Sequence, residues 1–175
     1  MRRDVGAGAT APQAGEARRG GEVTEKRRGR APIVVGYVPG GFDMFHIGHL
    51  NVLRTARQRC DRLIVGVAVD ESLIAMKGRP PVVPLHERME IVASLRFVDD
   101  VVSDYSQDKR VAWHAHPFDV LFKGDDWKGS PKGDRLEAEM AEVGVRVVYL
   151  PYTPSTSSTM LRQFLTTGIA REVVA

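Results

Sequence analysis

Short, nearly continuous apolar runs recur along the chain and are separated by longer stretches with helical periodicity. The first two runs are IVVGYV at residues 33–38 and RLIVGVAV at residues 62–69. Shorter runs follow at residues 101–102, 119–122 and 145–150. Runs that are rich in β-branched residues and lack polar alternation are typical of strands covered on both faces. We therefore expect buried strands at these positions.

The stretches between the runs predict helices. Residues 48–59 carry an apolar stripe at helical spacing, and residues 84–97 open with a proline, which a first helical turn tolerates. We also expect helices at residues 135–144 and 157–168, the latter capped by hydroxyl side chains. Strands that alternate with helices predict an α/β fold, a Rossmann-like doubly wound parallel sheet with helices on both faces. In such sheets ligands bind beyond the carboxyl ends of the strands.

Composition divides the chain into a tail and one domain. Residues 1–31 contain no Leu, Ile or aromatic residue, so burial cannot offset the entropy of ordering them. We expect a disordered N-terminal tail there and a single domain at residues 32–175, because 43% hydrophobic residues provide enough core material. The 25 Lys and Arg against 22 Asp and Glu leave a net charge of only +3, which does not point to nucleic acid as a partner.

Two absences favour a soluble, cytoplasmic protein. Cys60 is the single cysteine, so no internal disulfide can form and a reducing compartment is suitable. No apolar run approaches the roughly 20 residues that span a bilayer, and the N-terminus lacks the apolar segment of a secretory signal.

The stretch GGFDMFHIGHL follows the first predicted strand. Gly40 and Gly41 allow backbone amides to approach an anion, and the helix that begins a few residues later adds its positive end. His46 and His49 are one helical turn apart, so both imidazoles can donate to phosphate oxygens whose charge grows during bond breaking. A zinc site and a purely structural role remain as alternatives, although no third ligand has a recognisable spacing.

Three further loops at predicted carboxyl ends carry polar groups. AMKGRPP presents Lys77 and Arg79, GDDW presents Asp125 and Asp126, and PYTPSTSSTM brings a cluster of hydroxyls to the last helix. Each also has a plainer interpretation, as a solvated basic loop, a turn or a helix cap. Because no Ser or Cys nucleophile is paired with a base in a known signature, we expect catalysis by positioning and charge stabilisation on a nucleotide.

The motifs resemble those of a known family. HIGH, preceded by GGFD, resembles the HxGH signature of the nucleotidyltransferase superfamily. MKGRPPVVPLHER, LRFVDDVV, VLFKGDDW and STSST, in this order, resemble the cytidylyltransferases, and GDDW is most similar to glycerol-3-phosphate cytidylyltransferase. The resemblance covers about Ile33 to Phe164.

The resemblance implies that CTP and a phosphorylated alcohol, best matched by sn-glycerol 3-phosphate, give a CDP-alcohol and pyrophosphate, with Mg²⁺ and in a homodimer. We expect no metal ligand among the side chains, because no third ligand has a recognisable spacing to the two histidines. The implied catalytic residues are His46, His49 and Lys77. The two histidines also bind the nucleotide, with Gly40, Gly41, Phe42, Asp126, Thr153, Ser157, Ser158 and Thr159. The implied acceptor contacts are Asp43, Lys77, Arg96 and Trp127.

Other functions stay open beside this one. Within the class, the acceptor could be a phosphoethanolamine, phosphocholine, phosphonate or sugar phosphate, and the nucleotide could be ATP. Outside it, the alternatives are a non-catalytic nucleotide-binding protein and, as the weakest, a nucleic-acid binder that uses the basic tail.

Two positions depart from the family pattern. Gly41 stands where the family usually has Thr, and Tyr152 replaces an arginine that contacts the triphosphate. Arg162, one turn into the last predicted helix, is a candidate to take over that contact.

Overall fold

A parallel sheet forms the centre of the protein. The computed structural model describes residues 32–151, 153 and 156–172, so the predicted tail at residues 1–31 and Tyr152 lie outside the described residues. The five-stranded sheet has the order β3-β2-β1-β4-β5, and every neighbouring pair is parallel. The strands are β1 (Val35–Gly40), β2 (Arg62–Ala68), β3 (Asp100–Asp104), β4 (Val120–Gly124) and β5 (Arg146–Leu150).

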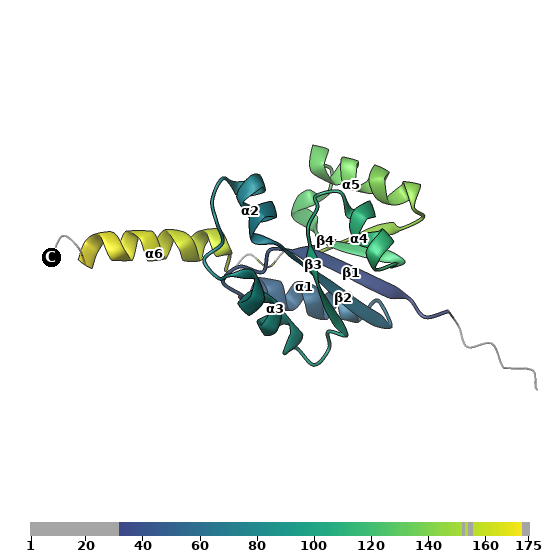
Figure 1. The fold of residues 1–175 in the computed structure, drawn as a ribbon, viewed down its shortest axis with the longest axis horizontal. Helices are drawn as coiled ribbons and strands as arrows, with labels where there is room; N and C mark the ends of the chain where they lie inside the picture. Colours follow the sequence, from purple (N-terminus) through teal and green to yellow (C-terminus); the bar gives the residue numbers. More distant parts are fainter. Residues whose placement is uncertain (1–31, 152, 154–155, 173–175) are drawn as a thin grey trace, which may run out of the picture. The chain divides into compact units, whose positions relative to one another are not determined.

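Helices cover both faces of the sheet (Figure 1). The helical elements of the chain are α1 (Ile47–Arg57), α2 (Asp70–Lys77), α3 (Leu85–Ala93), α4 (Lys109–Ala115), the 3₁₀ turn η1 (Asp125–Trp127), α5 (Pro131–Glu142) and α6 (Ser158–Glu172), of which α6 projects away from the sheet (Figure 1). Apolar side chains of α1 and α3 pack in one core cluster, which contains Val38 of β1. Side chains of α4 and α5 pack in the other, which contains Tyr37 of the same strand. The predicted doubly wound α/β fold is confirmed.

The strand order creates a switch point between β1 and β4. From β1 the chain winds outward to β2 and β3, and it then returns to place β4 and β5 on the other side of β1. The chain leaves β1 towards α1 on one face and leaves β4 towards α5 on the opposite face. In such folds a crevice opens between these two connections, beyond the carboxyl ends of the strands.

One close contact explains a glycine in the centre of the sheet. A Cβ atom at Gly66 would lie 1.8 Å from the Tyr37 hydroxyl oxygen, so only glycine lets the Tyr37 ring lie across β2. Tyr37 in turn stacks on Phe118, with ring centroids 4.5 Å apart.

Some predicted boundaries were wrong. Residues 75–81 are not a loop throughout, because α2 extends to Lys77 and ends at Gly78, whose φ of 67° is a left-handed helix terminus. Helix α2 buries only Leu73, so its apolar periodicity is too weak to detect. Helix α6 continues beyond the predicted end at residue 168, since a single glycine weakens a helix without terminating it.

Candidate active site

The connection between β1 and α1 has a constrained backbone. Phe42 and Met44 both have positive φ, 50° and 49°, which is unfavourable for residues with a side chain. The Phe42 ring is buried and lies over Gly40, where a Cβ atom would come within 2.8 Å of it. Gly40 therefore makes room for this ring, in addition to the anion contact predicted for it.

His46 is the N-cap of α1. Its Nδ1 accepts a hydrogen bond of 3.0 Å from the Gly48 backbone N–H, so the proton of the neutral ring resides on Nε2. A Cβ atom at Gly48 would lie 2.8 Å from the His46 ring, which explains the glycine between the two histidines. Burial lowers the pKa of His46. The cap thus fixes both the tautomer and the orientation of this imidazole.

His49 stacks on His46, with ring centroids 3.9 Å apart, and its ring also contacts Phe42 and Phe45. Its Nδ1 is buried and has no hydrogen-bond partner in the part of the chain that the structure describes. Burial, together with repulsion from His46 and Lys77, lowers the pKa of His49 to about 3. At neutral pH both imidazoles are therefore neutral, and each can donate one hydrogen bond.

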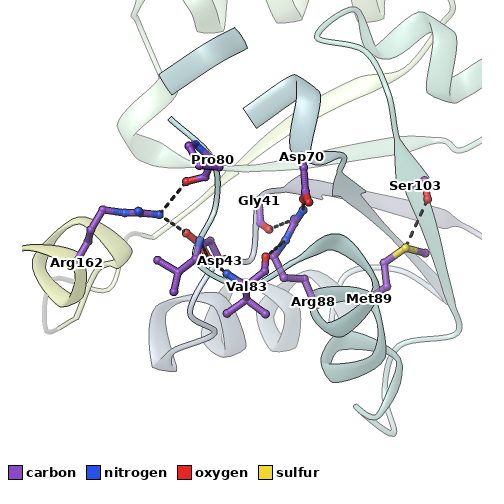
Figure 2. A network of polar contacts seen from close by, with 10 residues as sticks. Gly41, Asp43, Asp70, Pro80, Val83, Arg88, Met89, Ser103 and Arg162 are labelled. Atoms are coloured by element: carbon purple, nitrogen blue, oxygen red, sulfur yellow. Dashed lines mark hydrogen bonds and ion pairs between the residues drawn. The ribbon is translucent and has the colours of Figure 1, made fainter. Parts of the chain in front are cut away.

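Asp43 connects three segments of the site (Figure 2). Its Oδ1 accepts from the backbone N–H groups of Val82 and Val83 at 2.9 and 3.0 Å, and its Oδ2 accepts from Arg162 at 2.8 Å. Burial alone would raise the pKa of Asp43, but these donors outweigh burial and lower it. The Asp43 backbone carbonyl also accepts from the Ser158 hydroxyl at 2.7 Å. Since protein donors occupy both carboxylate oxygens, the acceptor contact predicted for Asp43 stays a prediction.

Arg88 is fully buried beneath this loop, and the sequence did not single it out. Its guanidinium donates to the carbonyls of Val83 and Gly41 at 2.9 and 2.5 Å and to Asp70 at 2.5 Å (Figure 2). These bonds join the β1–α1 connection, the start of α2 and the segment before α3. A buried arginine that donates to three acceptors fixes the backbone from which the site is built.

A cationic pocket lies between α2 and the start of α6. Lys77 is exposed overall, and its ammonium lies 3.9 Å from the place where a Cβ atom of Gly41 would be. Burial lowers the pKa of Lys77, although Asp43 counteracts this effect. The residues that line the pocket are Asp43, Leu73, Lys77, Arg79, Pro80, Pro81, Ser158, Thr159 and Arg162. Three cations, two hydroxyls and a helix N-terminus provide what a phosphate group needs.

The hydroxyl side chains at and before the start of α6 make different contacts. The Ser157 hydroxyl accepts from the Met160 backbone N–H at 3.2 Å and caps the helix, as predicted. The Ser158 hydroxyl donates to the Asp43 carbonyl, and both Ser158 and Thr159 line the pocket. Thr153 accepts a hydrogen bond of 3.1 Å from Asn51 of α1. Ser157 is thus the cap, Thr153 and Ser158 form hydrogen bonds to neighbouring segments, and Ser158 and Thr159 line the pocket.

The N-termini of α1 and α6 lie next to each other. The Thr156 carbonyl oxygen is 3.5 Å from the position that a Cβ atom of Gly48 would occupy. The contacts between Ser158 and Asp43 and between Asn51 and Thr153 link the same two segments. The structure therefore brings the imidazole pair and the hydroxyl-rich helical end to one place, as a shared polyphosphate site requires.

The far side of the site contains Asp126 and Trp127 in η1, directly after β4. Trp127 packs against the second core cluster, whereas Asp126 is exposed. The Lys123 ammonium lies 4.2 Å from the centroid of the Trp127 ring and donates to the Pro39 carbonyl at 3.3 Å. The sequence does not distinguish Lys123 as a site residue, because a lysine at the end of a strand is usually a surface residue.

Arg96 is not brought to this site. It is exposed in the connection from α3 to β3, which leads into the amino end of β3. The backbone of Asp99 in the same connection bonds to Leu63 at the start of β2. Arg96 thus lies at the opposite end of the strands from His46, and its predicted acceptor contact stays a prediction.

Residues 32–151, 153 and 156–172 contain no group of three or more His, Cys, Asp or Glu side chains that could hold a metal ion. Within the same residues, no helix is long and apolar enough to cross a membrane.

The sequence is similar to several enzymes. It is 42% identical to an ethanolamine-phosphate cytidylyltransferase of Arabidopsis thaliana over 75% of this chain, which spans only 32% of that enzyme. It is 37% identical to an FAD synthase of Pyrococcus horikoshii over 69% of this chain and 80% of the relative. It is 33% identical to a glycerol-3-phosphate cytidylyltransferase of Bacillus subtilis over 71% of this chain and 91% of the relative.

A family model covers most of the described chain. The model described as Cytidylyltransferase-like matches residues 37–164, from β1 into α6. This range contains the imidazole pair, the cationic pocket and η1, and it confirms the resemblance inferred from the motifs. The chain belongs to the Cytidylyltransferase-like family.

Proposed function

We propose that this protein transfers a cytidylyl group from CTP to a phosphorylated alcohol and releases pyrophosphate, with sn-glycerol 3-phosphate as the first candidate acceptor. The observation that carries the proposal is the convergence of two helix N-termini, an imidazole pair and a lysine at one end of the sheet. Such an arrangement stabilises the charge of a polyphosphate that gains negative charge as it leaves.

The reaction is an in-line displacement. A phosphate oxygen of the acceptor attacks the α-phosphorus of CTP, a new P–O bond forms, and the bond from the α-phosphorus to the bridging oxygen breaks. Since the attacking oxygen is already anionic, no general base is required. The departing pyrophosphate takes up the electron pair, and the donors around it are the neutral imidazole N–H groups, the Lys77 ammonium and the hydroxyls of α6.

Magnesium enters this proposal with the nucleotide. The described residues offer no cluster of carboxylates or imidazoles for a site held by the protein alone. Mg²⁺ commonly binds substrate phosphates and keeps several waters, so CTP itself would provide its ligands. The homodimer implied by the resemblance is also part of the proposal, and light scattering of the purified protein tests it.

The identity of the acceptor is the part of the proposed reaction for which the comparisons give the least information. The similarity to an ethanolamine-phosphate cytidylyltransferase is as strong as the similarity to a glycerol-3-phosphate cytidylyltransferase. Phosphoethanolamine is therefore the second candidate, followed by phosphocholine, a phosphonate or a sugar phosphate.

A panel of these acceptors with CTP and with ATP, scored by pyrophosphate release, tests the proposal. We expect release with CTP and one of the two leading acceptors. Pyrophosphate release with ATP and not with CTP would show that ATP is the nucleotide substrate. Binding of CTP without release with any acceptor would favour a non-catalytic nucleotide-binding protein.

A further inference from the structure

Lys123 occupies the switch point of the sheet. It is the penultimate residue of β4, and β4 runs beside β1 with Tyr37 paired to Leu121. Its side chain reaches across to the carbonyl of Pro39, just before the two glycines of the β1–α1 connection. A ligand in the crevice between β1 and β4 passes this ammonium.

The ammonium has few protein partners. An ammonium has three donors, yet among the described residues Lys123 makes one hydrogen bond, of 3.3 Å, and no ion pair. Lys109 differs, since its ammonium pairs with Asp104 at 2.6 Å. Lys123 instead lies over the Trp127 ring. A half-buried cation without a carboxylate is suited to an anion that arrives with a ligand.

The surroundings of Lys123 lower its pKa, but the ammonium is still mostly protonated at neutral pH. Burial lowers the pKa of Lys123 to about 8. The neighbouring ammonium groups of Lys109 on α4 and Lys77 on α2 act in the same direction, while Asp126 of η1 and Asp104 of β3 oppose them. An anion placed on this lysine would restore full protonation at neutral pH.

The reaction geometry indicates which anion belongs there. The cationic pocket of Lys77 and the start of α6 is suited to the pyrophosphate that leaves. In an in-line displacement the attacking oxygen approaches from the side opposite the leaving group. Lys123 does not line that pocket and lies on the other side of the β1 end, beside η1. It therefore faces the side from which the acceptor arrives.

We propose that Lys123 binds the phosphate of the acceptor and holds its oxygen in line with the α-phosphorus. This inference rests on the proposed function, because it takes the acceptor to be a phosphate. It makes Lys123 a specificity residue for an anionic acceptor, and it assigns Lys77 mainly to the polyphosphate.

The test compares K123M, which keeps the length of the side chain and removes the charge, with K123R and with K128M as a matched control. Lys128 is exposed. With the acceptor that the wild type uses, K123M should raise the Michaelis constant for that acceptor by about tenfold or more, the scale of one lost charged hydrogen bond. The dissociation constant of CTP, measured by calorimetry, should change less than about twofold. K123R should recover most of the loss, and K128M should resemble the wild type.

The pH profile provides a readout that a structural role would not change. Between pH 7 and 10 the wild-type Michaelis constant for the acceptor should rise as Lys123 loses its proton, whereas K123R should stay flatter because arginine keeps its charge. An unchanged acceptor constant in K123M would overturn the inference. A weakened CTP affinity with normal acceptor binding would also overturn it and place Lys123 on the nucleotide.

Different results would contradict the role of Lys123 and the proposed function. If the wild type releases no pyrophosphate, the proposed function fails, and titration of sn-glycerol 3-phosphate into the CTP-loaded protein still tests Lys123. Weaker binding by K123M than by K128M would support the inference. Equal binding by the two variants, or no binding even by the wild type, would overturn it.

Discussion

At the scale of single residues, the site works with neutral donors held in fixed orientations. His46 is oriented by the Gly48 N–H, and His49 is enclosed by aromatic rings that keep it uncharged. Positive charge comes instead from Lys77, Arg79 and Arg162, which line the pocket nearby. The histidines thus provide neutral hydrogen-bond donors, and the lysine and arginines provide the positive charge.

The H49A variant tests the first part of that division. It removes one preorganised donor, so turnover should fall by on the order of a hundredfold or more in a pyrophosphate-release assay. H86A is the matched control, because His86 is an exposed histidine of α3. Turnover of H49A close to that of H86A would contradict a role for His49 in the reaction.

The low pKa of His49 also predicts how stability depends on pH. Because the folded pKa of about 3 lies below the unfolded value of about 6.5, the unfolded state binds a proton first as pH falls. The stability tied to His49 is therefore complete above pH 6.5 and is lost progressively towards pH 3. The H49F variant, which cannot titrate, should lose less stability than the wild type between pH 7 and 4 in urea unfolding. Parallel curves for the two proteins would contradict the assigned pKa.

At the scale of elements, the strands of the sheet could be predicted from the sequence, whereas the charged residues that contact the loops at its carboxyl end could not. The apolar runs predicted all five strands, because buried strands need continuous apolar residues. Helix α4 buries no side chain, and α2 buries one, so neither has a periodic signal. Arg88 is buried and Lys123 partly buried, and each has partners distant in sequence, Gly41 and Asp70 for Arg88 and Pro39 for Lys123. Only the tertiary structure distinguishes such residues from surface charges.

Of these two residues, Arg88 makes the larger number of hydrogen bonds, and we expect it to contribute more to stability. The R88M variant would leave two carbonyls and Asp70 without their donor, so it should lower the free energy of unfolding by about 3 kcal/mol or more. The matched control is R54M, since Arg54 is exposed on α1. Denaturant unfolding measures both variants. A loss below about 1 kcal/mol in R88M would show that the three bonds are dispensable.

Arg162 links α6 to the remainder of the site and is the candidate replacement for the family's arginine. The R162A variant removes its bonds to Asp43 and Pro80 along with a cation of the pocket. We expect the Michaelis constant for CTP to rise about tenfold or more. Q163A, which changes the exposed neighbouring residue, should not alter this constant. An unchanged constant in R162A would remove Arg162 from triphosphate binding.

At the scale of the whole molecule, topology brings together residues that are distant along the chain. The histidines follow β1, Lys77 ends α2, η1 follows β4 and the hydroxyls begin α6, yet all lie at the carboxyl ends of one parallel sheet. A doubly wound fold places its connections there in any sequence. The side chains in those connections then determine which ligand is bound.

The proposed reaction requires one nucleotide to be held by the N-termini of both α1 and α6, and a crystal structure of the protein with bound CTP tests this directly. We predict that the β- and γ-phosphates lie within hydrogen-bond distance of an imidazole of the His46–His49 pair and of a hydroxyl or backbone N–H at Ser158–Thr159 in the same complex. A triphosphate that contacts only one of these groups, or that binds away from the carboxyl ends of β1 and β4, would contradict the account.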